Sequence, residues 1–477
     1  MTWVRDLAWE TLDLTSRSSV SHQLARYALN LQYEMLPQEV IHQAKRSVLD
    51  TLACAVGAYE APGRPICEDA VREIGGAEEA TMFGSGQRTS ALNATLVNSF
   101  LVRFLDYNDV GGGGHNSDSI PAILAISERE QARGQDFLSS TVIAYEIGAR
   151  FSKAADSEHL ASNGWCGDIR GGLSMPPALG KIMGLNEGEI ANAIGICASH
   201  SLPMNVLDAD AEENTMSKNL RFGFVSYNAI LSCILARKGF TGPVRVVEGD
   251  GGWREAIFRR EMDLGPLADF SGWRILETKH KSVAAHYGLQ GLIASTIAIV
   301  KENDLKPQDI SAVRITTSLR EKLHTATDRA KKYPRNAESA DHSAHFATAI
   351  AIKERAFGPD QVKPEKFTDP TVLDLIEKIT VEVDPGLPRK STASTTEITT
   401  NDGRRFQKHV EGAHGRLEDP LTDAEIETKF RHMADPYMTE KQIRKIFDTV
   451  WNLESIDNIN TLTGLMVFGA LAPRNRY

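Results

Sequence analysis

The spacing of apolar residues changes along this chain, and the change constrains the fold more than any other feature. Through about the first 240 residues, apolar side chains recur at helical spacing, as Val40, Ala44 and Val48 do in segment 39–58. From near residue 275 several segments instead alternate, as in ISAVRITT at 310–317. The pattern predicts a large helical domain and a smaller domain that contains a sheet.

Further segments fit this division. Helices are expected at 91–107, 119–133, 138–156, 171–184, 187–200, 218–238, 339–354 and 439–449. Strands are expected at 378–383, 395–400 and 404–410, the last two joined by the turn signal Asn401-Asp402-Gly403. We therefore expect a mainly α fold: a helical domain over 1–274, an inserted α/β (α+β) lid domain over 275–415, and a return to the helical domain over 416–477.

Charge and composition exclude several classes of function. The net charge of −10 disfavours a nucleic-acid partner, because phosphate binding requires a basic face. No apolar run reaches the roughly 18–20 residues that cross a bilayer, and the amino terminus lacks a secretory signal pattern. The five cysteines are scattered and odd in number, which indicates reduced thiols. We expect a cytoplasmic protein that binds neither nucleic acid nor membrane.

Residues 104–118, FLDYNDVGGGGHNSD, concentrate chemically useful side chains. Asp106 and Asp109 lie near the end of an expected helix, and four consecutive glycines separate them from His115. Each glycine inside a helix costs about 1 kcal/mol relative to alanine, so the run marks a break in the helix. Taken alone, the segment fits two interpretations: backbone that approaches a ligand closely, or a flexible helix end.

Three further segments carry candidate site residues, although each also has an ordinary structural explanation. A lysine near a helix start and a cluster of Lys and His are often solvated charges, and an Asp-His-Ser sequence often caps a helix. The candidates are Lys218; Lys279, His280, Lys281 and His286; and Asp341, His342 and His345. No HExxH, CxxC, GxGxxG, Walker or GxSxG motif is present, so neither a metal site, a nucleotide cofactor nor a serine hydrolase is expected.

The order of these segments resembles the MmgE/PrpD family, which contains 2-methylcitrate dehydratases, cis-aconitate decarboxylases and iminodisuccinate epimerases. The matching segments run through most of the chain: 47–58, 98–110, 115–118, 180–197, 236–243, 285–291, 338–346 and 418–430. The resemblance implies a helical domain with an α/β lid, an active site between them, a homodimer, and no metal or organic cofactor. The implied substrate is a small anionic carboxylate.

The resemblance also implies roles for individual residues. The implied catalytic residues are Asp106, His115, Lys218 and His286, and the expected substrate-binding residues are Arg103, Lys281 and His345. These residue types suit the chemistry, because a cation can hold a carboxylate through charge-assisted hydrogen bonds. A histidine that titrates near neutrality can move a proton to or from the substrate.

The chain departs from its relatives at several positions. Val110 replaces a common threonine, Phe346 a common tyrosine and Asn116 a proline, while Trp165 or Cys166 stands where decarboxylase relatives carry a histidine. The leading hypothesis is a lyase that dehydrates a 2-hydroxy di- or tricarboxylate of the 2-methylcitrate type. The alternatives are an epimerase of a substituted succinate, a decarboxylase of the cis-aconitate type, and a non-catalytic binding protein with the same fold.

Overall fold

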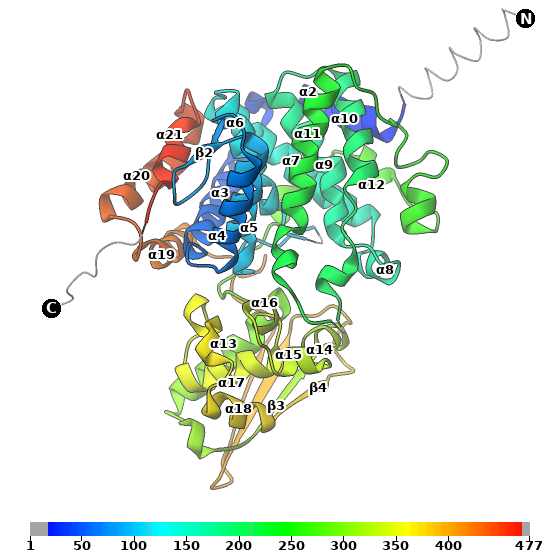
Figure 1. Cartoon of the computed structure of the whole chain (residues 1–477). Helices are drawn as coiled ribbons and strands as arrows, with labels where there is room; N and C mark the ends of the chain where they lie inside the picture. The colour runs from blue at the N-terminus through cyan, green and yellow to red at the C-terminus, as the bar shows by residue number, and fades with distance from the viewer. Residues whose placement is uncertain (1–17, 113, 211, 470–477) are drawn as a thin grey trace, which may run out of the picture.

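The computed structural model of the chain shows a large helical body joined to a smaller part that contains a sheet (Figure 1). It describes residues 18–112, 114–210 and 212–469. One hydrophobic core takes its side chains from 20–284 and again from 421–468, and a second core takes them from 285–398. The expected mainly α class with a smaller α/β part is confirmed, and the chain returns to the helical body after building the smaller part.

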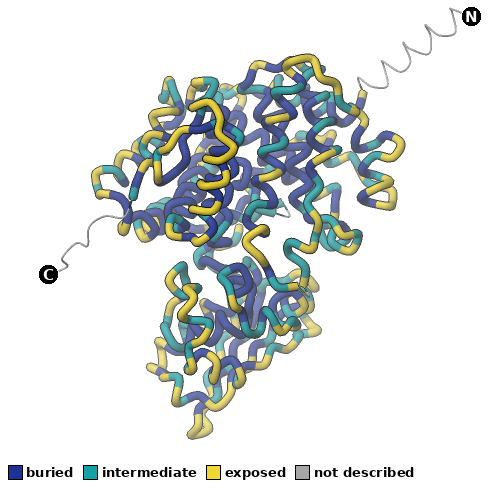
Figure 2. The backbone as a smooth tube through the Cα atoms, in the orientation of Figure 1, coloured by how far each residue is buried: buried dark blue, intermediate teal, exposed yellow. Residues whose placement is uncertain are grey.

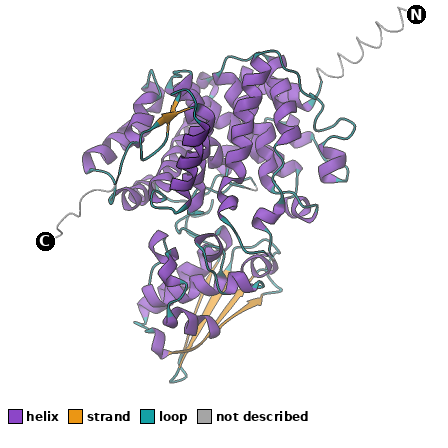
Figure 3. Ribbon diagram, in the orientation of Figure 1, coloured by secondary structure: helices purple, strands orange, loops and turns teal. Residues whose placement is uncertain are grey.

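Helices make up nearly all of the body (Figure 3). The apolar side chains predicted at helical spacing in 39–58 are buried. Val40, Ala44 and Val48 of α3 have no exposed surface. Within the described ranges, no helix has both the length and the apolar character that crossing a bilayer requires. The bounds are α2 (Val20–Asn30), α3 (Gln38–Gly57), α4 (Gly63–Ile74), α5 (Ala91–Phe104), α6 (Ile120–Arg129), α7 (Gly134–Ala154), α8 (Ser157–Ser162), α9 (Gly171–Ile182), α10 (Glu187–His200), α11 (Arg221–Arg237), α12 (Gly265–Ala268), α19 (Asp423–Ala434), α20 (Glu440–Trp451) and α21 (Asn460–Thr463).

The smaller part, called the lid below, is a four-stranded sheet with helices packed against it. The strand order is β4-β3-β5-β6, with β3 and β4 parallel and the other pairs antiparallel. Val313 of β3 lies opposite Ile379 on one side and Ile398 on the other. The bounds are β3 (Ile310–Thr317), β4 (Ile379–Val383), β5 (Ser394–Thr400), β6 (Arg405–Val410), α13 (Gln290–Glu302), α14 (Leu319–Ala326), α15 (Arg329–Lys332), α16 (Ala337–Ala340), α17 (Ala344–Glu354) and α18 (Pro370–Glu377); β1 (Ala80–Thr81) and β2 (Arg88–Thr89) form a separate hairpin in the body.

Burial along the strands shows why the sheet needs its helices (Figure 2). Every second residue of β5 is buried, which is the alternation of a sheet with one covered face. α13 packs against β5 and β6, and α17 packs against β4. The four strands predicted from alternation are confirmed, and β3 has the predicted bounds.

Among the helices whose observed bounds differ from the predicted ones, three differ near the candidate site. α5 ends at Phe104, so Asp106 and Asp109 lie in the loop that follows the helix. The predicted helix 339–354 is interrupted between α16 and α17, at residues 341–343. Lys218 lies in a 3₁₀ turn (Met216–Leu220) that precedes α11. Local spacing predicted the helices but not these breaks.

A buried ion pair fixes the returning carboxyl-terminal segment to the body. Lys429 of α19 donates to Asp50 of α3 at 2.6 Å and to the carbonyl oxygen of Tyr107 at 2.7 Å. Its Nζ also lies 3.3 Å from the carbonyl oxygen of Lys281 and 3.6 Å from the centre of the Tyr107 ring. Lys429 thereby joins α3, the loop after α5 and the segment that enters the lid.

Replacing Lys429 by methionine should lower the free energy of unfolding by about 3–5 kcal/mol, because the Asp50 carboxylate would stay buried without its partner. The measurement is urea denaturation followed by circular dichroism. Lys445→Met, at an exposed position on α20, is the control and should change stability by less than about 0.5 kcal/mol. Equal effects of the two substitutions would contradict the assigned role of Lys429.

Candidate active site

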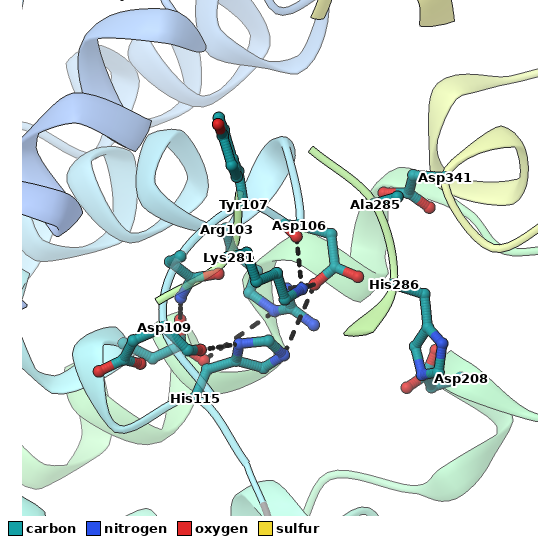
Figure 4. A network of polar contacts seen from close by, with 12 residues as sticks. Arg103, Asp106, Tyr107, Asp109, His115, Asp208, Lys281, Ala285, His286 and Asp341 are labelled. Carbon is teal, nitrogen blue, oxygen red and sulfur yellow. Dashed lines mark hydrogen bonds and ion pairs between the residues drawn. The ribbon is translucent and has the colours of Figure 1, made fainter. Parts of the chain in front are cut away.

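Asp106 adopts an unusual backbone conformation in the loop after α5 (Figure 4). Its φ of 43° lies in the left-handed region, which costs a non-glycine residue about 1–3 kcal/mol and persists where the surroundings enforce it. The buried carboxylate pairs with Arg103 and lies 3.0 Å from the Nζ of Lys281. Burial alone would raise the pKa of Asp106, but Lys281 and Arg103 outweigh burial and hold it well below its usual range. The carboxylate is therefore ionised.

His115 lies beside this carboxylate with one ring nitrogen already engaged. Its Nδ1 lies 2.5 Å from the carbonyl oxygen of Asp109, which accepts the Nδ1 proton. Its Nε2 lies 3.5 Å from Asp106 Oδ1. Burial, together with Arg103 and Lys281, lowers the pKa of His115 well below its usual value. In the empty site His115 is therefore a neutral imidazole with its lone pair on Nε2, and not the histidine titrating near neutrality that the sequence predicts.

The glycine run lets the loop pack tightly against the body. Gly112 has a φ of 54°, and a Cβ there would lie 2.5 Å from the Cα of Ala149. A Cβ on Gly114 would lie 2.5 Å from the guanidinium of Arg170. Arg170 in turn donates to the carbonyl oxygen of His115 at 2.8 Å. The structure therefore shows close approach of the glycine backbone to Ala149 and Arg170 of the protein itself.

The lid contributes a second histidine beside Asp106. His342, in the break between α16 and α17, lies with Nδ1 2.5 Å from Asp341 Oδ1 and Nε2 3.7 Å from Asp106 Oδ2. Lys218 of the body lies 3.4 Å from His342 Nδ1 and 4.0 Å from Asp341 Oδ1. His286 packs its ring 4.9 Å from that of His342 and accepts a hydrogen bond from the Gly288 amide. Burial raises the pKa of Asp341 to about 7.

These groups surround a cavity of about 1020 Å³ between the body and the lid. Three buried guanidinium groups line its body side, and imidazoles line its lid side. The lining includes Arg103, Asp106, Gly111, Gly112, Gly114, His115, Cys166, Asp168, Arg170, Asp208, Arg221, His286, His324 and His342. Arg221 pairs with Asp168 at 2.5 Å and with Asp208 at 2.8 Å, so the cavity wall holds acids as well as cations. Such a surface suits a small polar anion more than an apolar ligand.

The structure brings most of the residues expected from sequence to one place. Arg103, Asp106, His115 and His286 line the cavity, while Lys218 and Lys281 lie directly behind it and contact lining side chains. His345 is buried in α17, and it is not among the cavity-lining residues of the described chain. The place expected for it is taken by His342, three residues earlier. The sequence signal for His342 was an acid directly before a histidine at a helix start.

Two groups of side chains come close enough to consider as metal ligands. His286, His324 and His342 form one group and Asp106, Asp341 and His342 the other, with ligand atoms within 4.8 Å of one another. Positive charge already occupies the second group, because Arg103 and Lys281 bind Asp106 and Lys218 adjoins His342. A divalent cation would be repelled by these three charges. The charge around Asp106, Asp341 and His342 therefore disfavours a metal ion at that group.

The departures from the family pattern have different surroundings. Cys166 lines the cavity, and burial raises the pKa of its thiol to about 12, so it stays protonated. Phe346 is fully buried in the lid core and packs against Phe367. Val110 lines the cavity and pairs through its backbone with Lys279. Of these positions, Val110 and Cys166 can influence a ligand directly.

Comparison with known proteins places the chain among relatives of similar length. A cis-aconitate decarboxylase of Aspergillus terreus is 23% identical, covering 96% of this chain and 98% of the relative. An alkylcitrate dehydratase of a fungal species is 23% identical over 91% and 90% of the two chains, and a 2-methylcitrate dehydratase of Salmonella typhi is 23% identical over 88% and 90%. The MmgE/PrpD N-terminal domain matches residues 22–264 and the MmgE/PrpD C-terminal domain matches 283–453. Because the two matches cover most of the sequence and meet at the cavity, the chain belongs to the MmgE/PrpD family.

Proposed function

We propose that this protein is a carbon–oxygen lyase that dehydrates a small 2-hydroxy di- or tricarboxylate of the 2-methylcitrate type. The observation that carries the proposal is the neutral His115, whose free Nε2 faces a cavity lined by buried guanidinium groups. Relatives over nearly the whole chain are named as dehydratases or decarboxylases, which are both lyases. A homodimer is part of the same proposal.

Substrate carboxylates would bind to the cations that line or adjoin the cavity. Arg103, Arg170 and Arg221 offer planar guanidinium groups, which suit carboxylates because two N–H groups can donate in parallel. The Nε atoms of Arg103 and Arg170 are buried without a hydrogen-bond acceptor among the described residues, whereas Arg221 Nε already lies 2.5 Å from Asp168. Arg103 and Arg170 therefore have donor capacity left after pairing with their aspartates.

Removal of a proton next to a carboxylate requires a positioned base and stabilisation of the negative charge that develops on the carboxylate oxygens. In this proposal His115 Nε2 acts as the base, and the hydrogen bond from Nδ1 to the Asp109 carbonyl orients the ring. The arginines that bind the carboxylate stabilise the developing charge. Departure of the substrate hydroxyl as water needs a second proton, from a group other than His115.

Two observations rank dehydration above decarboxylation. Cys166, at one of the two positions where a decarboxylase histidine is expected, lines the cavity but holds its proton too tightly to exchange it near neutral pH. Trp165, at the other position, is not among the described lining residues. Both positions thus lack a side chain that titrates in the working range.

Incubation with citrate, 2-methylcitrate, cis-aconitate and N-substituted aspartates in deuterated water, followed by NMR, tests the proposal. Formation of an unsaturated acid from a hydroxy acid is the expected result. Loss of carbon dioxide, or deuterium uptake with inversion and no loss of water, would replace dehydration by decarboxylation or epimerisation. EDTA should leave the rate unchanged, and a requirement for an added divalent ion would contradict a cofactor-free mechanism.

His115→Asn tests the base. Asparagine keeps a donor near the position of Nδ1 and can still bond to the Asp109 carbonyl, but it lacks Nε2. Turnover should fall by at least about 100-fold while the protein stays folded, because a general base contributes on that scale. The measurement is kcat together with the melting temperature. His414→Ala, at a partly exposed surface position, is the control, and equal kcat values in the two variants would remove His115 from the mechanism.

Asp118 should make substrate binding depend on pH. This acid lies behind Arg103, 4.0 Å from its Nε, and burial raises its pKa to about 7. Above that pH Asp118 ionises and partly cancels the positive charge offered to the substrate, so KM should rise. In Asp118→Asn the rise should be smaller, giving a wild-type to variant KM ratio that grows by up to about tenfold from acidic to basic pH. Substrate ionisation affects both enzymes equally, so a constant ratio would contradict the prediction.

A further inference from the structure

We infer that His342, oriented by Asp341, is a second proton-transfer residue that works with His115 across Asp106. This inference rests on the proposed lyase function and deepens it, because a dehydration needs one group to take a proton and another to give one. His115 belongs to the body and His342 to the lid. The catalytic pair would be complete only where the two parts of the molecule meet.

The two imidazoles are arranged alike. In each, Nδ1 is bound to a fixed oxygen acceptor, the Asp109 carbonyl for His115 and the Asp341 carboxylate for His342, both at 2.5 Å. In each, Nε2 faces the Asp106 carboxylate, at 3.5 Å from Oδ1 and 3.7 Å from Oδ2 respectively. Both rings line the cavity. Donation from Nδ1 to these oxygens leaves the free lone pair of each ring on Nε2; for His342 this is the tautomer that accompanies an ionised Asp341, although Lys218 Nζ also lies 3.4 Å from that Nδ1.

Enzymes orient an imidazole for proton transfer by a hydrogen bond between one of its ring nitrogens and a carboxylate. Asp341 is buried with only 3% of its surface exposed, and His342 with 1%. The pair lies in the break between α16 and α17, where the Ser343 side chain caps α17 by accepting from the Phe346 amide. The capped helix start therefore holds His342 in place, and the acid before it sets the ring orientation.

The proton balance of a dehydration fits two such groups. One imidazole takes a proton from the carbon next to a carboxylate, and that C–H electron pair forms the new carbon–carbon double bond. The carbon–oxygen bond breaks, and the leaving hydroxyl takes a proton from the other imidazole and departs as water. The products are an unsaturated acid and water, and one proton must then pass from the first imidazole to the second. Asp106, which adjoins both Nε2 atoms, lies on the shortest route for that proton.

The charges around His342 come from several elements. Facing it are Asp341, Lys218, Asp106, Asp208, His286 and His324. Lys218 opposes protonation of His342, whereas Asp106 and Asp208 favour it. Substrate carboxylates would compensate Lys218 and so help His342 to hold the proton that the leaving group requires. His342 would then act as the acid while His115 acts as the base.

His342→Asn isolates the proposed role, because asparagine can keep the bond to Asp341 but has no Nε2. With 2-methylcitrate, or the panel acid that wild type converts, kcat should fall at least about 100-fold with KM changed less than about fivefold. In His342→Ala, whose side-chain space opens to the cavity, added imidazole should restore kcat at least about tenfold. Asp341→Asn should lower kcat and shift its pH profile, and Asp341→Glu should restore part of the rate.

His409→Ala, at an exposed position on β6 of the same lid, is the matched control and should keep wild-type kcat without any response to imidazole. A kcat within about fivefold of wild type in folded His342→Asn, or a loss confined to KM, would overturn the inference. Absence of imidazole rescue in folded His342→Ala would overturn it as well. Failure of the lyase proposal can be told apart from failure of this inference, because the wild-type protein would then release no water from any acid of the panel. In that case, deuterium exchange at carbon measures proton transfer in the same variants.

Discussion

The Asp106 carboxylate is the charge around which the candidate site is organised. Arg103 reaches it from α5, Lys281 from the segment that enters the lid, and His342 from the lid itself. A buried carboxylate without such partners would take up a proton, so Lys281 and Arg103 are what keep Asp106 ionised. The same pairing compensates the left-handed backbone that aims the carboxylate at the cavity.

The carboxyl-terminal helices support this arrangement from behind. Lys429 binds the carbonyl oxygens of Tyr107 and Lys281, which adjoin Asp106 in the chain and in space. Its charge is balanced by Asp50 of α3. A lysine on a late helix therefore fixes two backbone segments of the site, and the return of the chain to the body has a chemical as well as a packing consequence.

Helical and alternating spacing was enough to predict α3, the four lid strands and the division of the chain, because those patterns are local. The ends of helices near the site were not predictable in this way. α5 stops before Asp106, and that residue pairs with Lys281, which lies 175 positions away in the chain. The sequence contains both His342 and His345, and His345 was the one expected to bind substrate, but His342, which lies in the helix break, is the one that lines the cavity. The glycine run was ambiguous until Ala149 and Arg170 showed what it accommodates.

The charges around the two imidazoles indicate how their pKa values would change when an anion binds. Without substrate, burial lowers the pKa of both imidazoles, Arg103 and Lys281 add to this effect at His115, and Lys218 adds to it at His342, so both imidazoles are neutral. A bound dicarboxylate would bring negative charge to those same cations and weaken their effect on the imidazoles. The substrate itself would then provide the charge that lets an imidazole carry a proton. Under the proposed function, proton transfer in this cavity would be tied to the binding of the anionic substrate.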